Sequence, residues 1–197
     1  MKIFRLLVVL LVGFAAWHYF STRPVHRPPG VLAASDPVQV DIPDGRPFAF
    51  GKYQVTPLAQ FNVRARVLSA ETYSHGREAD LSPIDLALGW GRMSDSAVID
   101  KLAISQGGRF YFYSWTNQPP LPPQEIIEHS ANMHLIPANA LAEKQLGQVR
   151  VGNIVDISGY LVRADAQDGW RWISSLTRMD SGNGSCEVVF VERLAIK

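Results

Sequence analysis

Cysteine and histidine are the residues of this chain whose types best suit catalysis. Cys186 is the single cysteine, and His129 and His134 lie five residues apart with Asn132 between them. A thiol activated by an imidazole base is the centre of a cysteine hydrolase, and an amide can orient the base. Against this, no known nucleophile signature surrounds Cys186, and a lone cysteine in phase with the apolar residues of an alternating strand is usually a small core residue. A hydrolase centred on Cys186 with His134 or His129 is therefore our alternative hypothesis.

A metal site is the second chemistry that these histidines suggest, and their spacing argues against it. Ligand pairs on one helix face lie about three or four residues apart, whereas His129 and His134 are separated by five. Glu125 and Glu128 lie close in sequence, but further ligands would have to come from distant segments. No Cys/His pattern typical of a zinc site occurs either. We predict that the protein holds no metal and no cofactor.

Two short segments are the best candidates for a binding surface. Trp90 stands between two glycines and is followed by Arg92, a pattern typical of a tight loop that carries a large contact side chain. The segment Ser130–His134 places polar residues, including Asn132 and His134, inside an apolar frame. We predict that Trp90, Arg92, Asn132 and His134 bind a partner. The alternative for Trp90 is that it fills one end of a barrel core.

Three segments with a period of two predict the sheet that would position these residues. Phe61–Ser69 alternates apolar and polar residues, as a half-buried strand does. Gly152–Leu176 predicts two strands, with a bulge or bend at Gly159 and a tight turn at Asp168-Gly169. Cys186–Leu194 predicts the closing strand.

Aromatic residues and short helices occupy the segments between these strands. Arg109–Trp115 predicts a strand in which Phe110 and Phe112 face the core. Ser82 is a suitable N-cap, and Asp85 falls in the first turn of the helix expected after it. Further short helices are expected at 94–101, 124–129 and 138–146.

The predicted fold class is α+β: a small curled antiparallel sheet or OB-like β-barrel with short inserted helices, preceded by one N-terminal transmembrane helix. The order of strand, inserted helices, Gly-interrupted strand, hairpin and closing strand resembles an OB-like barrel over Phe61–Leu194. Nucleic-acid binding by such a sheet would need a basic face. Residues 1–30 carry four of the 19 basic residues and no acidic one, which leaves 15 basic and 18 acidic residues. Nucleic acid is therefore not the expected partner.

The amino terminus predicts a membrane anchor. Leu6–Trp17 is an uninterrupted apolar run, and with its flanks it approaches the roughly 17–25 residues that cross a bilayer. Bulky residues follow the run where a signal-peptidase site would need small ones, which favours retention over cleavage. Trp17 and Tyr19 are typical of the aromatic belt at a membrane surface. We predict an uncleaved transmembrane anchor at 1–20 that contacts the membrane through residues 3–20.

The remainder divides into a spacer and a body. Residues 21–47 hold six prolines, a density typical of an extended linker, so we predict a Pro-rich linker at 21–47 and a globular β-rich domain at 48–197. Basic residues before the apolar run favour a cytoplasmic amino terminus. This orientation predicts a single-pass protein of a bacterial inner membrane, with its domain in the periplasm. The leading hypothesis is an envelope protein whose extracytoplasmic domain binds a protein or glycan partner without catalysis.

Overall fold

The computed structural model describes residues 5, 8, 10–14, 23–177, 182 and 184–197. Most of the anchor predicted at 1–20 lies outside these residues. Within the part of the chain that is described, no helix has both the length and the apolar character needed to cross a membrane.

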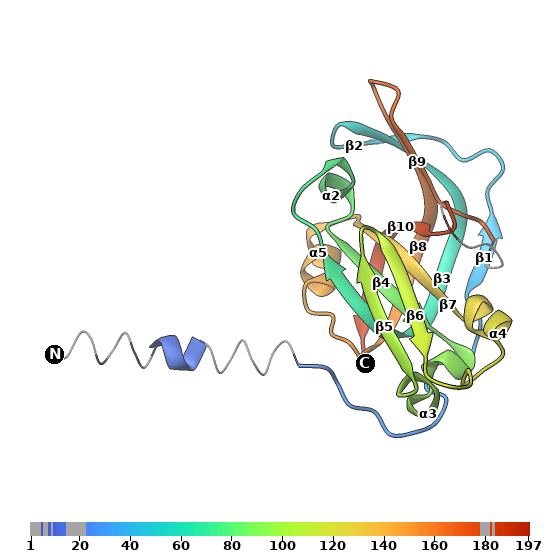
Figure 1. The fold of residues 1–197 in the computed structure, drawn as a ribbon. Helices are drawn as coiled ribbons and strands as arrows, with labels where there is room; N and C mark the ends of the chain where they lie inside the picture. The colour runs from blue at the N-terminus through green and yellow to red at the C-terminus, as the bar shows by residue number, and fades with distance from the viewer. Residues whose placement is uncertain (1–4, 6–7, 9, 15–22, 178–181, 183) are drawn as a thin grey trace.

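Five strands form a ring-like sheet at the centre of the protein (Figure 1). In spatial order they are β3 (Tyr53–Thr72), β4 (Ile84–Gly89), β7 (Ser130–Pro137), β10 (Glu187–Ile196) and β8 (Ile154–Ala166), and β8 also pairs with β3. All of these pairings are antiparallel except that between β7 and β10. The predicted sheet-dominant α+β fold is confirmed, but the sheet is mixed rather than antiparallel. The reason is that β10 inserts between β7 and β8 and runs antiparallel to β8.

Shorter elements surround the ring. β1 (Val38–Asp41) and β2 (Phe48–Phe50) pair with β3, β9 (Arg171–Ile173) pairs with β8, and β5 (Leu102–Gly107) and β6 (Phe110–Trp115) form a separate hairpin. The helical segments are α2 (Arg77–Leu81), the 3-10 turn η1 (Gly91–Ser94), α3 (Ser96–Ile99), α4 (Pro123–Glu128) and α5 (Ala140–Leu146). The hairpin β5–β6 is inserted between β4 and β7 in the chain, and this insertion shapes the site described below.

The main core lies inside the ring. Every second residue of β3 from Ala59 to Val67 is buried there, including Phe61, Val63 and Ala65, as the alternation of this segment predicts. Apolar residues from the other four ring strands complete it: Leu86, Leu88, Met133, Leu135, Val155, Ile157, Leu161, Val189, Val191 and Leu194. The interior of the ring is therefore filled with apolar side chains.

The hairpin at the carboxyl end of β8 follows the prediction in one feature and departs from it in another. Gly169 adopts a φ of 87°, a left-handed conformation that glycine accepts without strain, so the tight turn is confirmed. The bulge predicted at Gly159 lies instead on β10, where the register shifts between Val191 and Arg193. Gly159 faces that bulge, and a Cβ atom built there would lie 1.9 Å from the Phe190 carbonyl oxygen.

The described part of the Pro-rich segment is hydrogen-bonded to the domain at several points. The Val25 N–H donates to the Val151 carbonyl, and Arg27 Nε donates to the Gly152 carbonyl at 3.1 Å. The Ala33 N–H donates to Ser94 Oγ at 3.0 Å. Further along the same segment, Val38–Asp41 form β1, which pairs with β3. Prolines prevent this segment from bonding to itself, so its amide groups bond to the domain instead. The segment passes beneath α3 in Figure 1.

Candidate functional site

The outer surface of β4 and β7 carries polar residues where the inner surface carries apolar ones. Asp85 pairs in register with His134, and Ala87 pairs with Asn132. Side chains alternate across a strand, so these residues point out of the ring while their neighbours point into it. Nevertheless Asp85 is fully buried and His134 is 4% exposed. Buried polar groups need partners, which other segments must supply.

The structure places Asp85 in a strand, which corrects the helix predicted after Ser82. The helix α2 ends before Ser82, and β4 begins at Ile84. All six residues of β4 are buried, because the ring covers one face and the β5–β6 insertion covers the other. A strand buried on both faces lacks the alternation that distinguishes it from a helix, so the N-cap pattern alone misassigned the segment.

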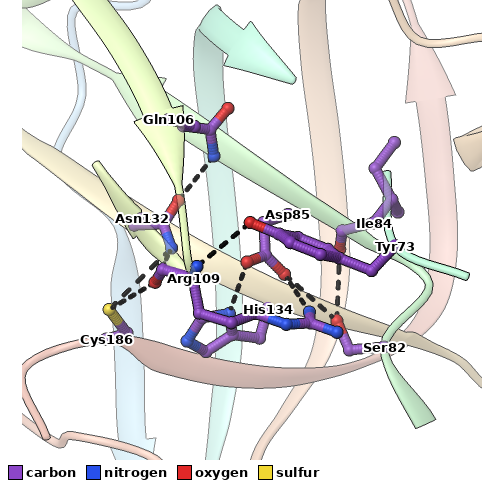
Figure 2. Close-up of polar contacts among 9 residues, drawn as sticks. All are labelled: Tyr73, Ser82, Ile84, Asp85, Gln106, Arg109, Asn132, His134 and Cys186. Atoms are coloured by element: carbon purple, nitrogen blue, oxygen red, sulfur yellow. Dashed lines mark hydrogen bonds and ion pairs between the residues drawn. The ribbon is translucent and has the colours of Figure 1, made fainter. Parts of the chain in front are cut away.

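Arg109 is the main partner of Asp85 and comes from the turn of the inserted hairpin. Its Nη1 atom lies 2.7 Å from Asp85 Oδ1, and its guanidinium stacks on the Tyr73 ring at 3.7 Å (Figure 2). The Arg109 N–H also donates to the Tyr73 hydroxyl at 3.1 Å. An arginine that is 18% exposed in its side chain thus neutralises a carboxylate that is fully buried.

His134 contacts the same carboxylate from the other side. Its Nδ1 atom lies 2.9 Å from Asp85 Oδ2, and neither atom has an aligned hydrogen bond with any described residue. The indole of Trp172, from β9, packs against the imidazole with ring centroids 4.8 Å apart. Asp85 therefore occupies the Nδ1 side of the imidazole, and Trp172 restricts the rotation of the His134 side chain. The Nε2 atom is thus directed away from the carboxylate.

Asn132 and Cys186 continue this polar surface toward β10. Asn132 Nδ2 donates to the Arg109 carbonyl at 3.0 Å and lies 3.9 Å from Cys186 Sγ. Gln106 Nε2, from β5, donates to Asn132 Oδ1 at 2.6 Å. The thiol of Cys186 lies 3.9 Å from the Arg109 carbonyl oxygen. Figure 2 shows that the inserted hairpin, β7 and the start of β10 meet around these four residues.

Two pockets on this surface share Phe110 and Cys186, and together we name them the outer groove. One end is lined mainly by aromatic and neutral polar residues, among them Tyr111, Tyr113, Ser130 and Asn132, together with Glu187. The other end is lined by charged and aromatic residues, among them Glu78, Arg109, His134 and Trp172. The half-buried Cys186 stands where the two ends meet.

The aromatic faces of β6 are the reverse of the prediction. Phe110 and Phe112 are 37% and 53% exposed, whereas Tyr111 and Tyr113 pack against the cluster beneath the hairpin. A two-stranded hairpin covers β4 with one face only, so its other face meets solvent. Burial raises the pKa of Tyr111 to about 12. The exposed phenylalanines therefore belong to the surface beside the outer groove.

The structure brings some of the predicted site residues together and separates the others. Asn132, His134 and Cys186 line the outer groove. Trp90 is fully buried in the main core, which is the alternative that we considered for it. Arg92 lies elsewhere on the surface, with Nη1 3.2 Å from the Glu125 carboxylate. His129 belongs to that second region, because its Nδ1 lies 3.0 Å from the Glu125 carbonyl oxygen.

Sequence reasoning missed Arg109, Asp85 and Trp172 as members of the site. Asp85 carried a usable signal, since an acid inside the apolar run Ile84–Gly89 indicates a buried and therefore paired charge. Arg109 follows two glycines at a hairpin turn, which marks the turn but not its partner. Within the described residues, no cluster of three or more His, Cys, Asp or Glu side chains is arranged to hold a metal ion.

Comparison of the chain with protein-family models, with curated proteins and with solved structures found no match. Any function must therefore be argued from the geometry of the outer groove and from the sequence itself.

Proposed function

We propose that this chain is a membrane-anchored envelope protein whose domain binds a glycan in the outer groove. The observation that carries the proposal is the position of the groove. It lies on the outer face of β4 and β7, between the connection from β3 to β4, which contains α2, and the connection from β8 to β10, which contains β9. Glu78 and Trp172 border it from these two connections.

The strand arrangement supports an OB-type barrel. The ring strands follow one another in the chain in the order β3, β4, β7, β8 and β10. The third and fifth of these, β7 and β10, run parallel, and α5 lies between the third and fourth, β7 and β8. This order resembles the arrangement of an OB-type barrel, in which oligosaccharides and oligonucleotides bind across the second and third strands between two flanking loops. The outer groove occupies the corresponding face, and the β5–β6 insertion forms one of its walls.

The groove chemistry favours a glycan over a nucleic acid. Phe110 and Phe112 offer exposed aromatic surface on which the apolar face of a sugar can stack. Asn132 and Ser130 supply neutral hydrogen-bonding groups at the same end of the groove. The net negative charge of the chain after residue 30 would repel a polyanion.

The packed amino-terminal segment supports a location close to the membrane. Arg27 Nη2 donates to the Lys197 carbonyl at 2.5 Å, and its Nε donates to Gly152. A chain leaving a membrane anchor near residue 20 would thus reach the domain within a few residues. We propose that this connection holds the domain beside the bilayer, in the periplasm, where envelope glycans are within reach.

Cosedimentation of the full-length protein, purified in detergent, with isolated peptidoglycan sacculi tests the proposal. We expect the wild type to sediment and the variant Phe110→Ala, at a residue that lines both ends of the groove, to bind roughly tenfold more weakly, because a lost aromatic contact costs about 0.5–1.5 kcal/mol. Val40→Ala is the matched control, since Val40 is 56% exposed on β1, outside the groove lining. Failure of the wild type to bind sacculi or soluble glycan fragments, or equal weakening by both variants, would contradict the proposal.

A further inference from the structure

Cys186 and His134 lie on the same side of the ring: His134 is on β7, and Cys186 directly precedes the neighbouring strand β10. His134 pairs in register with Val188, so Cys186 precedes that partner by two residues and points to the same side. Asn132, which shares the outer face of β7 with His134, has its Nδ2 atom 3.9 Å from Cys186 Sγ, so the thiol reaches this face of β7. Both residues line the end of the outer groove that also contains Trp172.

His134 provides an observation that is independent of the thiol. Its side chain is 5% exposed and lines the groove, while Asp85 lies against Nδ1. The two nitrogens of an imidazole point in divergent directions, so Nε2 faces the groove. No hydrogen bond of Nε2 with a described residue is present. A nearly buried polar atom that faces a pocket without a partner indicates a role toward a ligand or a reacting group.

We propose that Cys186 is a nucleophile that accepts an acyl group, with His134 as its general base and Asp85 as a positioning residue. This activity goes beyond glycan binding and does not depend on it. His134 Nε2 takes the thiol proton as Sγ attacks the carbonyl carbon of an ester or thioester. The new C–S bond forms, the bond to the leaving group breaks, and His134 returns the proton to the departing alcohol or thiol. Water, deprotonated by His134, then releases the acyl group as a carboxylic acid and restores the thiol.

The surrounding groups fit these roles. Asn132 Nδ2 lies 3.9 Å from the sulfur, where it can donate to the oxygen that becomes negative after attack. The charged groups that face His134 are Asp85 from β4, Arg109 from the hairpin turn and Glu78 from α2. Asp85 Oδ2 lies 2.9 Å from His134 Nδ1, where it can hold the imidazole in place while Nε2 takes the thiol proton.

The test uses p-nitrophenyl acetate and iodoacetamide as probes on the full-length protein. With p-nitrophenyl acetate we expect a burst of nitrophenolate equal in amount to the protein, and mass spectrometry should place one acetyl group on Cys186. His134→Gln should slow acetylation at neutral pH by roughly 100-fold or more, the usual contribution of a general base. His129→Gln is the matched control, because His129 lies on the separate surface beside Glu125, and it should leave the rate unchanged.

The pH profile of Cys186 alkylation by iodoacetamide shows whether Asp85 positions His134 for catalysis or only supports the fold. In the wild type we expect alkylation to persist well below neutral pH, because the imidazolium stabilises the thiolate, and Asp85→Asn should move the profile toward that of free cysteine. If Asp85→Asn fails to fold, His134→Gln should show the same change. A wild-type profile that matches free cysteine, together with no acetyl adduct, would overturn the proposal and would leave glycan binding untouched.

Discussion

The inner and outer faces of β4 and β7 belong to the same strands but are built in opposite ways. The inner face carries Leu86 and Met133, which need only apolar neighbours of suitable volume. The outer face carries Asp85 and His134, which are equally buried but depend on specific partners. A shift of one residue along the strand therefore separates a core position from a position in the site.

The two faces also differ in where their neighbours come from. The inner face packs mainly against other ring strands, and Trp90 and the α5 residues Ala142 and Leu146 complete it. The outer face is completed by Tyr73, Arg109 and Trp172, which come from three connections outside the ring. The difference shows that the inserted hairpin is part of the site, because without Arg109 the buried carboxylate of Asp85 would keep only His134 and the Ser82 hydroxyl as polar neighbours.

The largest effect is expected from Asp85→Ala on the outer face. This variant should lower the free energy of unfolding by about 4 kcal/mol, because it leaves the mostly buried Arg109 guanidinium without a carboxylate. Chemical denaturation measures the change. The double variant Asp85→Leu with Arg109→Met should recover most of the loss, since it removes both charges. If the double variant is as unstable as the single one, the charge pair does not account for the effect.

Leu86→Ala, one residue away on the inner face, should cost about 3 kcal/mol through the cavity that it leaves in the ring. Leu141→Ala, at a position that is 64% exposed, is the control and should have little effect. Measuring the rate of Cys186 alkylation under native conditions, in the wild type and in Leu86→Ala, also tests whether the inner face affects the outer one. We expect Leu86→Ala to leave that rate unchanged, whereas a large change would mean that the two faces are not independent.

The sequence predicts the inner face much better than the outer one. The alternation of Phe61, Val63 and Val67 follows directly from burial against the ring, so it is readable without a structure. The pairing of Asp85 with Arg109 joins residues 24 positions apart through an insertion whose docking no local pattern encodes. The outer groove was therefore predictable only in part, through Asn132, His134 and Cys186, and not through the partners that orient them.

Tyr111 gives a pH-dependent test of how tightly the inserted hairpin covers β4. Burial raises its pKa to about 12, whereas the residue ionises near pH 10 when unfolded. Between these values the folded state holds the extra proton, so stability should fall as pH rises, by about 2 kcal/mol at pH 12. The loss should be absent in Tyr111→Phe, measured by denaturation at each pH. An equal loss in both proteins would show that the phenol is not held in a buried position.

Arg27→Gln should have the smallest effect, about 1 kcal/mol, because it removes hydrogen bonds at the surface of the domain. Arg46→Gln, which changes an exposed arginine, is the control. The variant should also raise amide hydrogen exchange at Val25, whose N–H donates to Val151. Unchanged exchange at Val25 would mean that the segment packs against the domain without Arg27.

The most direct test of a ligand-binding outer face is an NMR titration of the protein with a soluble peptidoglycan glycan fragment. Binding in the outer groove predicts that amide resonances of Asn132, His134 and Cys186 shift in a saturable way, while those of Val38 and Val40 on β1 stay fixed. Saturable shifts confined to β1, or no shift at any residue up to millimolar glycan, would contradict the account.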